Sequence, residues 1–299
     1  MAVYKRNYKR FEGALTDPRW RFMILARYAL QTVLESRLLA SFATLCLAPH
    51  LVALILIYLR NNPGAAGVLN LPFLQFIEID GTFFLRVFSI ETYLSFLLVT
   101  FVGPNLIAPD LANNALPLYL SRPVSKREYI IGKLSVLIAL TSLITWIPGL
   151  LVIAIQTNQA GLSWLFANAR IPIAVFVGSL IWTVTISLIA LALSAWVKMR
   201  PTAIFSLFGV FFVAGSFGNL VNTLLNLQPP WGLLMDMNTT MSALWQWLLL
   251  GQSEFGFTFR RIRLDAGLPS WTALVSLAGF SAVSLFLLVK KVRACEVVR

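Results

Sequence analysis

The sequence predicts an all-α, polytopic integral membrane protein with about six transmembrane helices and an N-terminal interfacial amphipathic helix. Two observations carry this prediction. Of the 299 residues, 58% are hydrophobic and only 12% are charged, whereas soluble globular chains carry roughly 25% charged residues. The chain also contains six apolar runs, each long enough to cross a bilayer core as a helix of roughly 20 residues.

The six runs are predicted to be helices rather than strands of a barrel. They lie at residues 39–59, 87–108, 134–155, 171–197, 202–225 and 271–289. Backbone polar groups in lipid must be satisfied within a helix or a closed barrel. Because the runs lack the strict alternation of barrel strands, we expect one six-helix transmembrane domain over residues 39–290.

Residues 1–38 are predicted to form a cytoplasmic basic segment followed by an interfacial helix. Asp17 and Pro18 make a helix-start signal, since Asp caps a helix and Pro favours its first position. From residue 19 to 38, apolar positions alternate with charged ones, which is typical of a helix lying on a membrane surface. A cytoplasmic extension of the first span is the alternative interpretation.

The net charge of +12 is unevenly distributed along the chain. Most of the 24 Lys and Arg residues lie in the N-terminal segment, the second-to-third loop, the fourth-to-fifth loop and the tail at 291–299. Such an excess marks cytoplasmic segments. We therefore expect a multi-pass protein of the plasma (inner) membrane with both termini in the cytoplasm, and membrane lipids rather than nucleic acid as the partner of the basic charge.

The predicted outer loop at residues 227–270 is the longest connection. It is rich in aromatic residues, among them Trp231, Trp245 and Trp247. Its stretch 241–250 is apolar but too short to span a bilayer. Because Trp favours the headgroup level, we expect this stretch to rest at the outer interface.

The sequence offers no recognisable catalytic, metal-binding or nucleotide-binding motif. One His and two Cys residues are too few for a typical zinc site. The pair Gly132-Lys133 is followed by Leu134 and lacks the first Gly of a phosphate-binding loop. Ser216 lies mid-span among small residues that favour close packing. We therefore expect no catalytic residue, no cofactor and no metal, and an energy source outside this chain.

Three ionisable residues of the first two spans are candidates for a polar path or for anchoring at the interface: Glu91, Arg86 and His50. A charge inside a bilayer costs about 3 kcal/mol on insertion scales, so such a residue is a functional hypothesis. Glu91 is expected either to approach the interface together with Arg86 or to line a polar path. His50 follows Pro49, and its imidazole is expected to satisfy the carbonyl that the proline leaves free. In the third span, Pro148 is expected to produce a kink.

The second-to-third loop, residues 109–133, is expected to form short helices broken by turns. Asp110 follows a proline and is placed to start a helix. Asn114 tolerates the left-handed conformation of a turn. Ser125 is expected to cap a second helix, with Glu128 at the spacing of a capping box.

The same segment resembles the corresponding loop of the permease subunits of the ABC-2 type transporter family. There the loop reads as an acidic residue, a Gly-Thr-Leu turn, several Leu residues, an Arg/Thr-Pro-Val-Ser-Arg-Arg-Glu motif and Gly-Lys. This chain departs from that pattern at Asn114, where the family usually has Gly. It matches at Asp110, Leu116, Leu118, Arg122, Pro123, Val124, Ser125, Lys126, Arg127, Glu128, Tyr129, Gly132 and Lys133.

The resemblance implies the membrane-spanning permease subunit of an ATP-binding cassette transporter. We expect an exporter, although the residues do not distinguish export from import. It further implies that a separate ATP-binding subunit docks on residues 109–133, and that a second permease copy or a paralogue completes a dimer. The residues alone leave alternatives open. They are a membrane-embedded lipid-modifying enzyme, a non-transporting regulatory protein, and basic loop residues that only maintain topology and bind anionic lipid.

Overall fold

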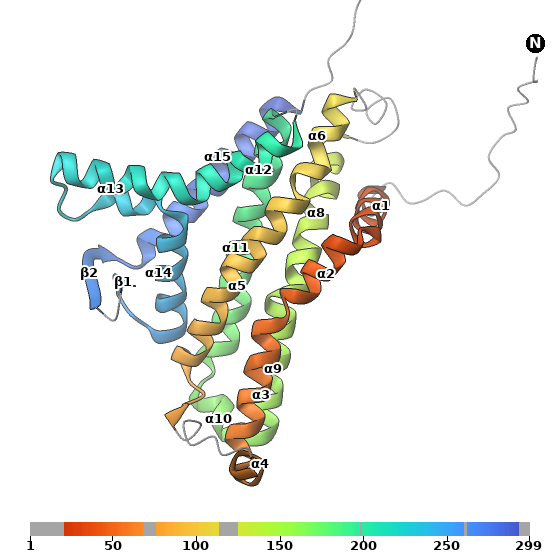
Figure 1. Cartoon of the computed structure of the whole chain (residues 1–299). Coiled ribbons are helices and arrows are strands. Elements are labelled where there is room, and N and C mark those ends of the chain that lie inside the picture. Colours follow the sequence, from red (N-terminus) through yellow and green to blue (C-terminus); the bar gives the residue numbers. More distant parts are fainter. Residues whose placement is uncertain (1–20, 69–75, 114–124, 198, 260–261, 293–299) are drawn as a thin grey trace, which may run out of the picture.

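The computed structural model describes residues 21–68, 76–113, 125–197, 199–259 and 262–292 (Figure 1). This part of the chain is almost entirely helical. Six helical stretches are long and apolar enough to cross a membrane, namely Arg37–Asn61, Gly81–Leu111, Lys126–Ala160, Arg170–Trp196, Arg200–Leu225 and Trp271–Lys291. The prediction of an all-α polytopic membrane protein is confirmed.

The first half of the chain forms α1 (Arg21–Glu35), α2 (Arg37–Leu45), α3 (Ala48–Asn61), α4 (Pro63–Val68), α5 (Gly81–Val102), α6 (Pro104–Ala112), α8 (Lys126–Ile144) and α9 (Trp146–Ala160). The second half forms α10 (Leu162–Ala167), α11 (Arg170–Trp196), α12 (Arg200–Phe208), the π-helical turn η3 (Gly209–Val213), α13 (Ala214–Leu225), the 3-10 turn η4 (Trp231–Met235), α14 (Met237–Leu250) and α15 (Trp271–Lys291). A two-stranded antiparallel hairpin, which the sequence analysis did not predict, separates α14 from α15. Its strands are β1 (Glu254–Phe259) and β2 (Ile262–Pro269).

Three of the spans are broken at positions that prolines explain; in the second, α5 ends before Pro104, the first residue of α6. The first span consists of α2 and α3, and Pro49 lies in the first turn of α3, where it has no N–H to donate to the preceding turn. In the third span, α8 ends at Ile144 and Thr145 has φ −107° and ψ −94° before α9 begins. Pro148 leaves the carbonyl of Ile144 without its helical donor, so the predicted kink is confirmed.

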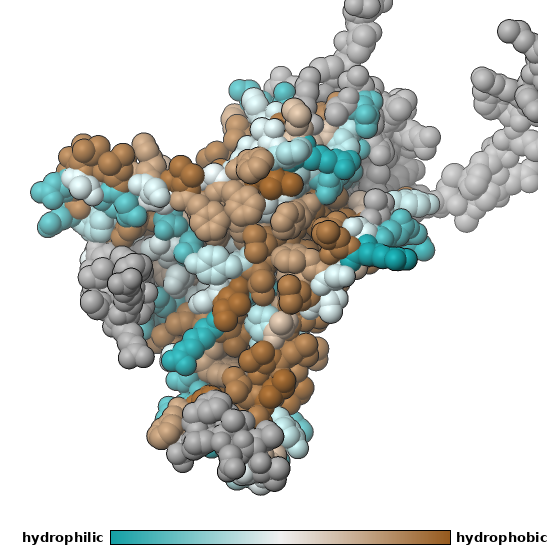
Figure 2. All heavy atoms as spheres, viewed as in Figure 1, coloured by the Kyte–Doolittle hydropathy of each residue, from teal (hydrophilic) through white to brown (hydrophobic). Residues whose placement is uncertain are grey.

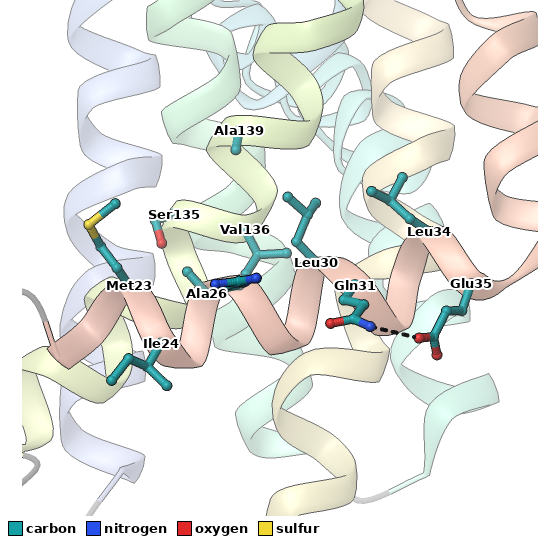
Figure 3. A pocket seen from close by; sticks show the side chains of 11 residues that line it. Met23, Ile24, Ala26, Leu30, Gln31, Leu34, Glu35, Ser135, Val136 and Ala139 are labelled. Atoms are coloured by element: carbon teal, nitrogen blue, oxygen red, sulfur yellow. Dashed lines mark hydrogen bonds between the residues drawn. The ribbon is translucent and has the colours of Figure 1, made fainter. Parts of the chain in front are cut away.

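The N-terminal helix α1 packs on α8 and runs crosswise to the bundle rather than along it (Figure 3). This is the orientation expected of an interfacial amphipathic helix. The predicted start signal at Asp17 and Pro18 lies outside the described residues. Figure 2 shows hydrophobic residues over much of the visible face of the bundle, as expected for a surface in contact with lipid.

The described helix ends agree with the predicted sidedness of the charges. In Figure 1, the end of α6, the starts of α8 and α12, and the end of α15 lie together at one end of the molecule, which therefore carries Lys126, Arg200 and Lys290. The start of α11 and the end of α3, with Arg170 and Arg60, lie toward the opposite end. The assignment of the first end to the cytoplasm stays a prediction.

Helix α11 lies at the centre of the core and packs against α5, α6, α8, α14 and α15. Polar contacts join these helices inside the bundle. The indole N–H of Trp182 donates to Ser95 Oγ over 2.9 Å, and that of Trp245 donates to Thr92 Oγ1 over 3.1 Å. Because these indoles are buried in the protein, each hydrogen bond satisfies a donor that would otherwise be unpaired.

The sequence did not predict how residues 241–250 pack. Helix α14 packs against α5, α11 and α15, and Trp245 is only 2% exposed. The ring of Trp245 lies against the backbone of Gly178 in α11, where there is no side chain to block it. Trp245 is therefore a packing residue between α14 and α11.

Replacing Gly178 by alanine is expected to destabilise the protein by about 1–3 kcal/mol, because overpacking forces neighbours to shift. A methyl group at this position would lie 2.5 Å from a ring atom of Trp245. Thermal unfolding of the purified protein in detergent would measure the loss. Gly279→Ala in α15 is the matched control, since nothing lies within 4 Å of its added methyl group. A Gly178→Ala protein as stable as this control would contradict the packing of α14.

Candidate functional site

The segment singled out by its sequence begins in α6 and ends in α8. The structure describes both of its ends, up to Asn113 and from Ser125 onward. Lys126 and Arg127 lie in the first turn of α8, and Arg127 is exposed. Six of the predicted site residues lie outside the described residues: Asn114, Leu116, Leu118, Arg122, Pro123 and Val124.

The start of α8 is the one that the sequence predicted. Ser125 Oγ accepts a hydrogen bond from the backbone N–H of Glu128 over 3.2 Å, and the backbone N–H of Ser125 donates to the Glu128 carboxylate. These two bonds form a complete capping box. The capping box defines where the loop ends and where the helix that enters the bundle begins.

Asp110, Tyr129 and Lys133 form a polar cluster that joins α6 to α8. Lys133 Nζ lies 2.9 Å from Asp110 Oδ2, and the Tyr129 hydroxyl donates to the same oxygen over 2.7 Å. The ammonium of Lys133 also lies 5.6 Å from the centre of the Tyr129 ring. Tyr129 is fully buried, and the side chains of Lys133 and Asp110 are only 10% and 16% exposed. The cluster therefore ties the two ends of the segment together.

The role predicted for Asp110 as a helix start is wrong. Helix α6 begins at Pro104 and continues through Pro109, so Asp110 lies near its C-terminal end. Ser194 of α11 explains how the helix tolerates the inner proline. The Ser194 Oγ accepts a hydrogen bond from the backbone N–H of Ala108 over 3.0 Å and donates one to the carbonyl of Pro104 over 3.3 Å. The hydroxyl thus stands between two backbone groups that would bond to each other in a regular helix.

A second polar site lies within the first two spans, where His50 of α3 faces Glu91 of α5. Nδ1 of His50 lies 3.7 Å from Oε2 of Glu91. The two residues are 2% and 1% exposed. Within the described residues, neither imidazole nitrogen and neither carboxylate oxygen has a hydrogen-bond partner. The pair is thus enclosed by protein, and its two side chains face each other without a hydrogen-bond network.

Three expectations for these residues are corrected by the structure. His50 does not satisfy the carbonyl left free by Pro49, because its nitrogens make no hydrogen bond. Glu91 is buried in the bundle rather than exposed beside Arg86. Arg86 is exposed and does not pair with Glu91. It instead lines a cavity of about 530 Å³ beside α3 and α5, whose other lining residues are apolar.

A larger cavity, of about 1010 Å³, lies between α1 and α8 (Figure 3). Its α8 wall consists of Ser135, Val136 and Ala139. In Figure 3, Met23 and Leu30 of α1 point toward this wall. The sequence reasoning missed this cavity. Its only sequence signal was the spacing of two small residues, Ser135 and Ala139, on one face of a helix.

The fold defines the chain as a membrane protein with six candidate spans. No protein-family model matches the chain, and no curated protein matches it. Among the described residues, no group of three or more His, Cys, Asp and Glu side chains is placed to hold a metal ion. A proposal for its function therefore rests on the architecture of the segment at 109–133 and on its resemblance.

Proposed function

We propose that this chain is the membrane-spanning permease subunit of an ATP-driven exporter, and that a separate ATP-binding subunit docks on residues 109–133. The observation that carries the proposal is the cluster of Asp110, Tyr129 and Lys133. It joins α6 and α8, the two helices that the described parts of this segment enter. Movement applied to the loop would therefore reach two helices at once.

The two helices that leave the cluster enter the core of the bundle. Helix α6 packs on α11 and is bonded to it through Ser194. Helix α8 packs on α5, α9 and α11. Packed helices that shift as rigid elements are a common means of carrying a conformational change between sites. A conformational change in a docked ATPase would therefore reach the membrane-spanning helices directly through α6 and α8.

The loop's basic residues also fit a docking role. Arg127 is exposed at the start of a capped helix, and exposed, geometrically ordered cations favour recognition of a complementary surface. We place this surface in the cytoplasm, at the inner membrane, with both termini on the same side. The proposed partners are the ATPase, a second permease copy or paralogue, and membrane lipids.

Co-purification tests the proposal. The detergent-solubilised wild type is expected to retain an ATP-binding protein from its native membrane, and the variant Arg122→Ala/Lys126→Ala/Arg127→Ala is expected to lose it. The loss should be at least ten-fold, since several charged contacts of an interface are removed together. Quantitative mass spectrometry of the purified samples provides the measurement.

The matched control is Arg200→Ala/Lys290→Ala/Lys291→Ala. It removes the same number of positive charges from helix ends at the same end of the molecule. The control should retain the ATPase at the wild-type level. If both variants lose the ATPase equally, the loop contributes only unspecific positive charge and is not a docking site. If the wild-type sample contains no ATP-binding protein, the enzyme or regulatory alternatives are favoured.

A further inference from the structure

The cavity between α1 and α8 has the size and lining of a ligand site. Its volume of about 1010 Å³ is comparable with the upper end of the range for small-molecule sites, about 300–1,000 Å³. Apolar side chains from both helices make up most of its walls, including Met23, Ile24, Leu30 and Leu34 of α1. An occupant must therefore present mainly hydrocarbon to the protein.

The shape of the α8 wall indicates where the cavity leads. Ser135 and Ala139 lie four residues apart, so their small side chains occupy one face of the helix. The same row continues with Ile131 before them and Leu143 after them, which are 49% and 53% exposed. The cavity is therefore aligned with an exposed apolar strip of a membrane-spanning helix, and this strip faces lipid acyl chains in a bilayer.

The charged residues that line the cavity indicate the charge of the molecule that would bind there. Arg27 of α1 lines the cavity and is exposed, and within the described residues no carboxylate lies within salt-bridge distance of it. The acidic lining residue, Glu35, lies two turns away and accepts a hydrogen bond from Gln31 Nε2 over 3.1 Å. An unpaired cation beside an apolar cavity complements an anionic headgroup on a hydrocarbon chain.

We propose that this cavity is a binding site for an anionic phospholipid of the surrounding bilayer. One acyl chain lies between α1 and the row of Ser135 and Ala139, and Arg27 contacts the phosphate. The lipid completes the packing between the crosswise helix α1 and the bundle. This site does not depend on the proposed transport activity, since it involves neither the loop at 109–133 nor an ATPase.

Native mass spectrometry of the purified full-length protein tests the site, with phosphatidylglycerol and phosphatidylcholine as probes. The wild type is expected to bind one phosphatidylglycerol more tightly than phosphatidylcholine. Arg27→Ala should weaken phosphatidylglycerol binding about five-fold, the effect of one cation at a membrane surface. It should weaken phosphatidylcholine binding less, because the choline cation neutralises that lipid's phosphate. Ala139→Phe should reduce binding of both lipids at least ten-fold, because the ring fills the space of the chain.

Two control variants locate the effect. Arg37→Ala removes an exposed cation from the neighbouring helix α2. Leu143→Phe enlarges a residue of the same α8 row that lies outside the cavity. Both variants should bind lipid as the wild type does. Ser135→Leu provides a second filling variant if Ala139→Phe does not give a monodisperse protein. Undiminished lipid binding by the filling variants, or an equal effect of Arg27→Ala and Arg37→Ala, would overturn the proposal.

Discussion

Replacing His50 by leucine is expected to destabilise the protein by about 1–3 kcal/mol, because it leaves the buried polar side chain of Glu91 without the polar group that faces it. The substitution leaves Glu91 enclosed at 1% exposure without the imidazole that lies 3.7 Å from its carboxylate. No described side chain donates a hydrogen bond to this carboxyl group. Denaturant-induced unfolding of the purified protein in detergent would measure the loss.

The double variant His50→Leu/Glu91→Leu is expected to recover most of that stability. Replacing both partners of a buried polar pair by apolar groups of similar shape can be nearly neutral or stabilising, because it removes the desolvation cost of both groups. Glu91→Gln should likewise be milder than His50→Leu, since it keeps a polar side chain of the same size facing the imidazole. If the single and double leucine variants unfold alike, the pair is not energetically coupled and its proximity is incidental.

Replacing Lys133 by methionine should produce the second large effect, about 3 kcal/mol of lost stability. If the proposed ATP-binding subunit docks on residues 109–133, the same variant should also lose coupling to it. Lys133 and Asp110 are largely buried, so breaking their ion pair leaves a poorly solvated carboxylate in α6. The same unfolding measurement reports the stability. The ATPase rate of the reconstituted complex, with and without the permease variant, reports the coupling.

Two further variants separate the ion pair from the rest of the cluster. Tyr129→Phe removes the hydroxyl that donates to Asp110 and should cost about 1.5–3 kcal/mol, the usual range for a hydrogen bond to a charged group. The exchange Asp110→Lys/Lys133→Asp should restore part of the stability lost in Lys133→Met. Coupling that persists in Lys133→Met would show that the cluster only holds the fold and does not transmit movement.

The features that could be predicted from the sequence depend on local signals. The length and apolarity of the runs predicted the six spans, because a bilayer sets the minimum length of an apolar helix. The start of α8 followed from the spacing of Ser125 and Glu128, and the break near Thr145 from Pro148. Each of these signals involves residues within a few positions of one another.

The features that only the tertiary structure decided depend on contacts between distant parts of the chain. Trp245 is separated from Thr92 by 153 positions, and the bonds that carry α6 past Pro109 come from Ser194, far along the sequence in α11. The sequence identified Glu91 and His50 as unusual because they are polar residues in apolar runs. It did not predict that the two side chains lie next to each other. The sequence thus determined which segments become helices and where they begin, whereas packing between helices determined which polar groups meet, because burial leaves each of them only the partners that its neighbours supply.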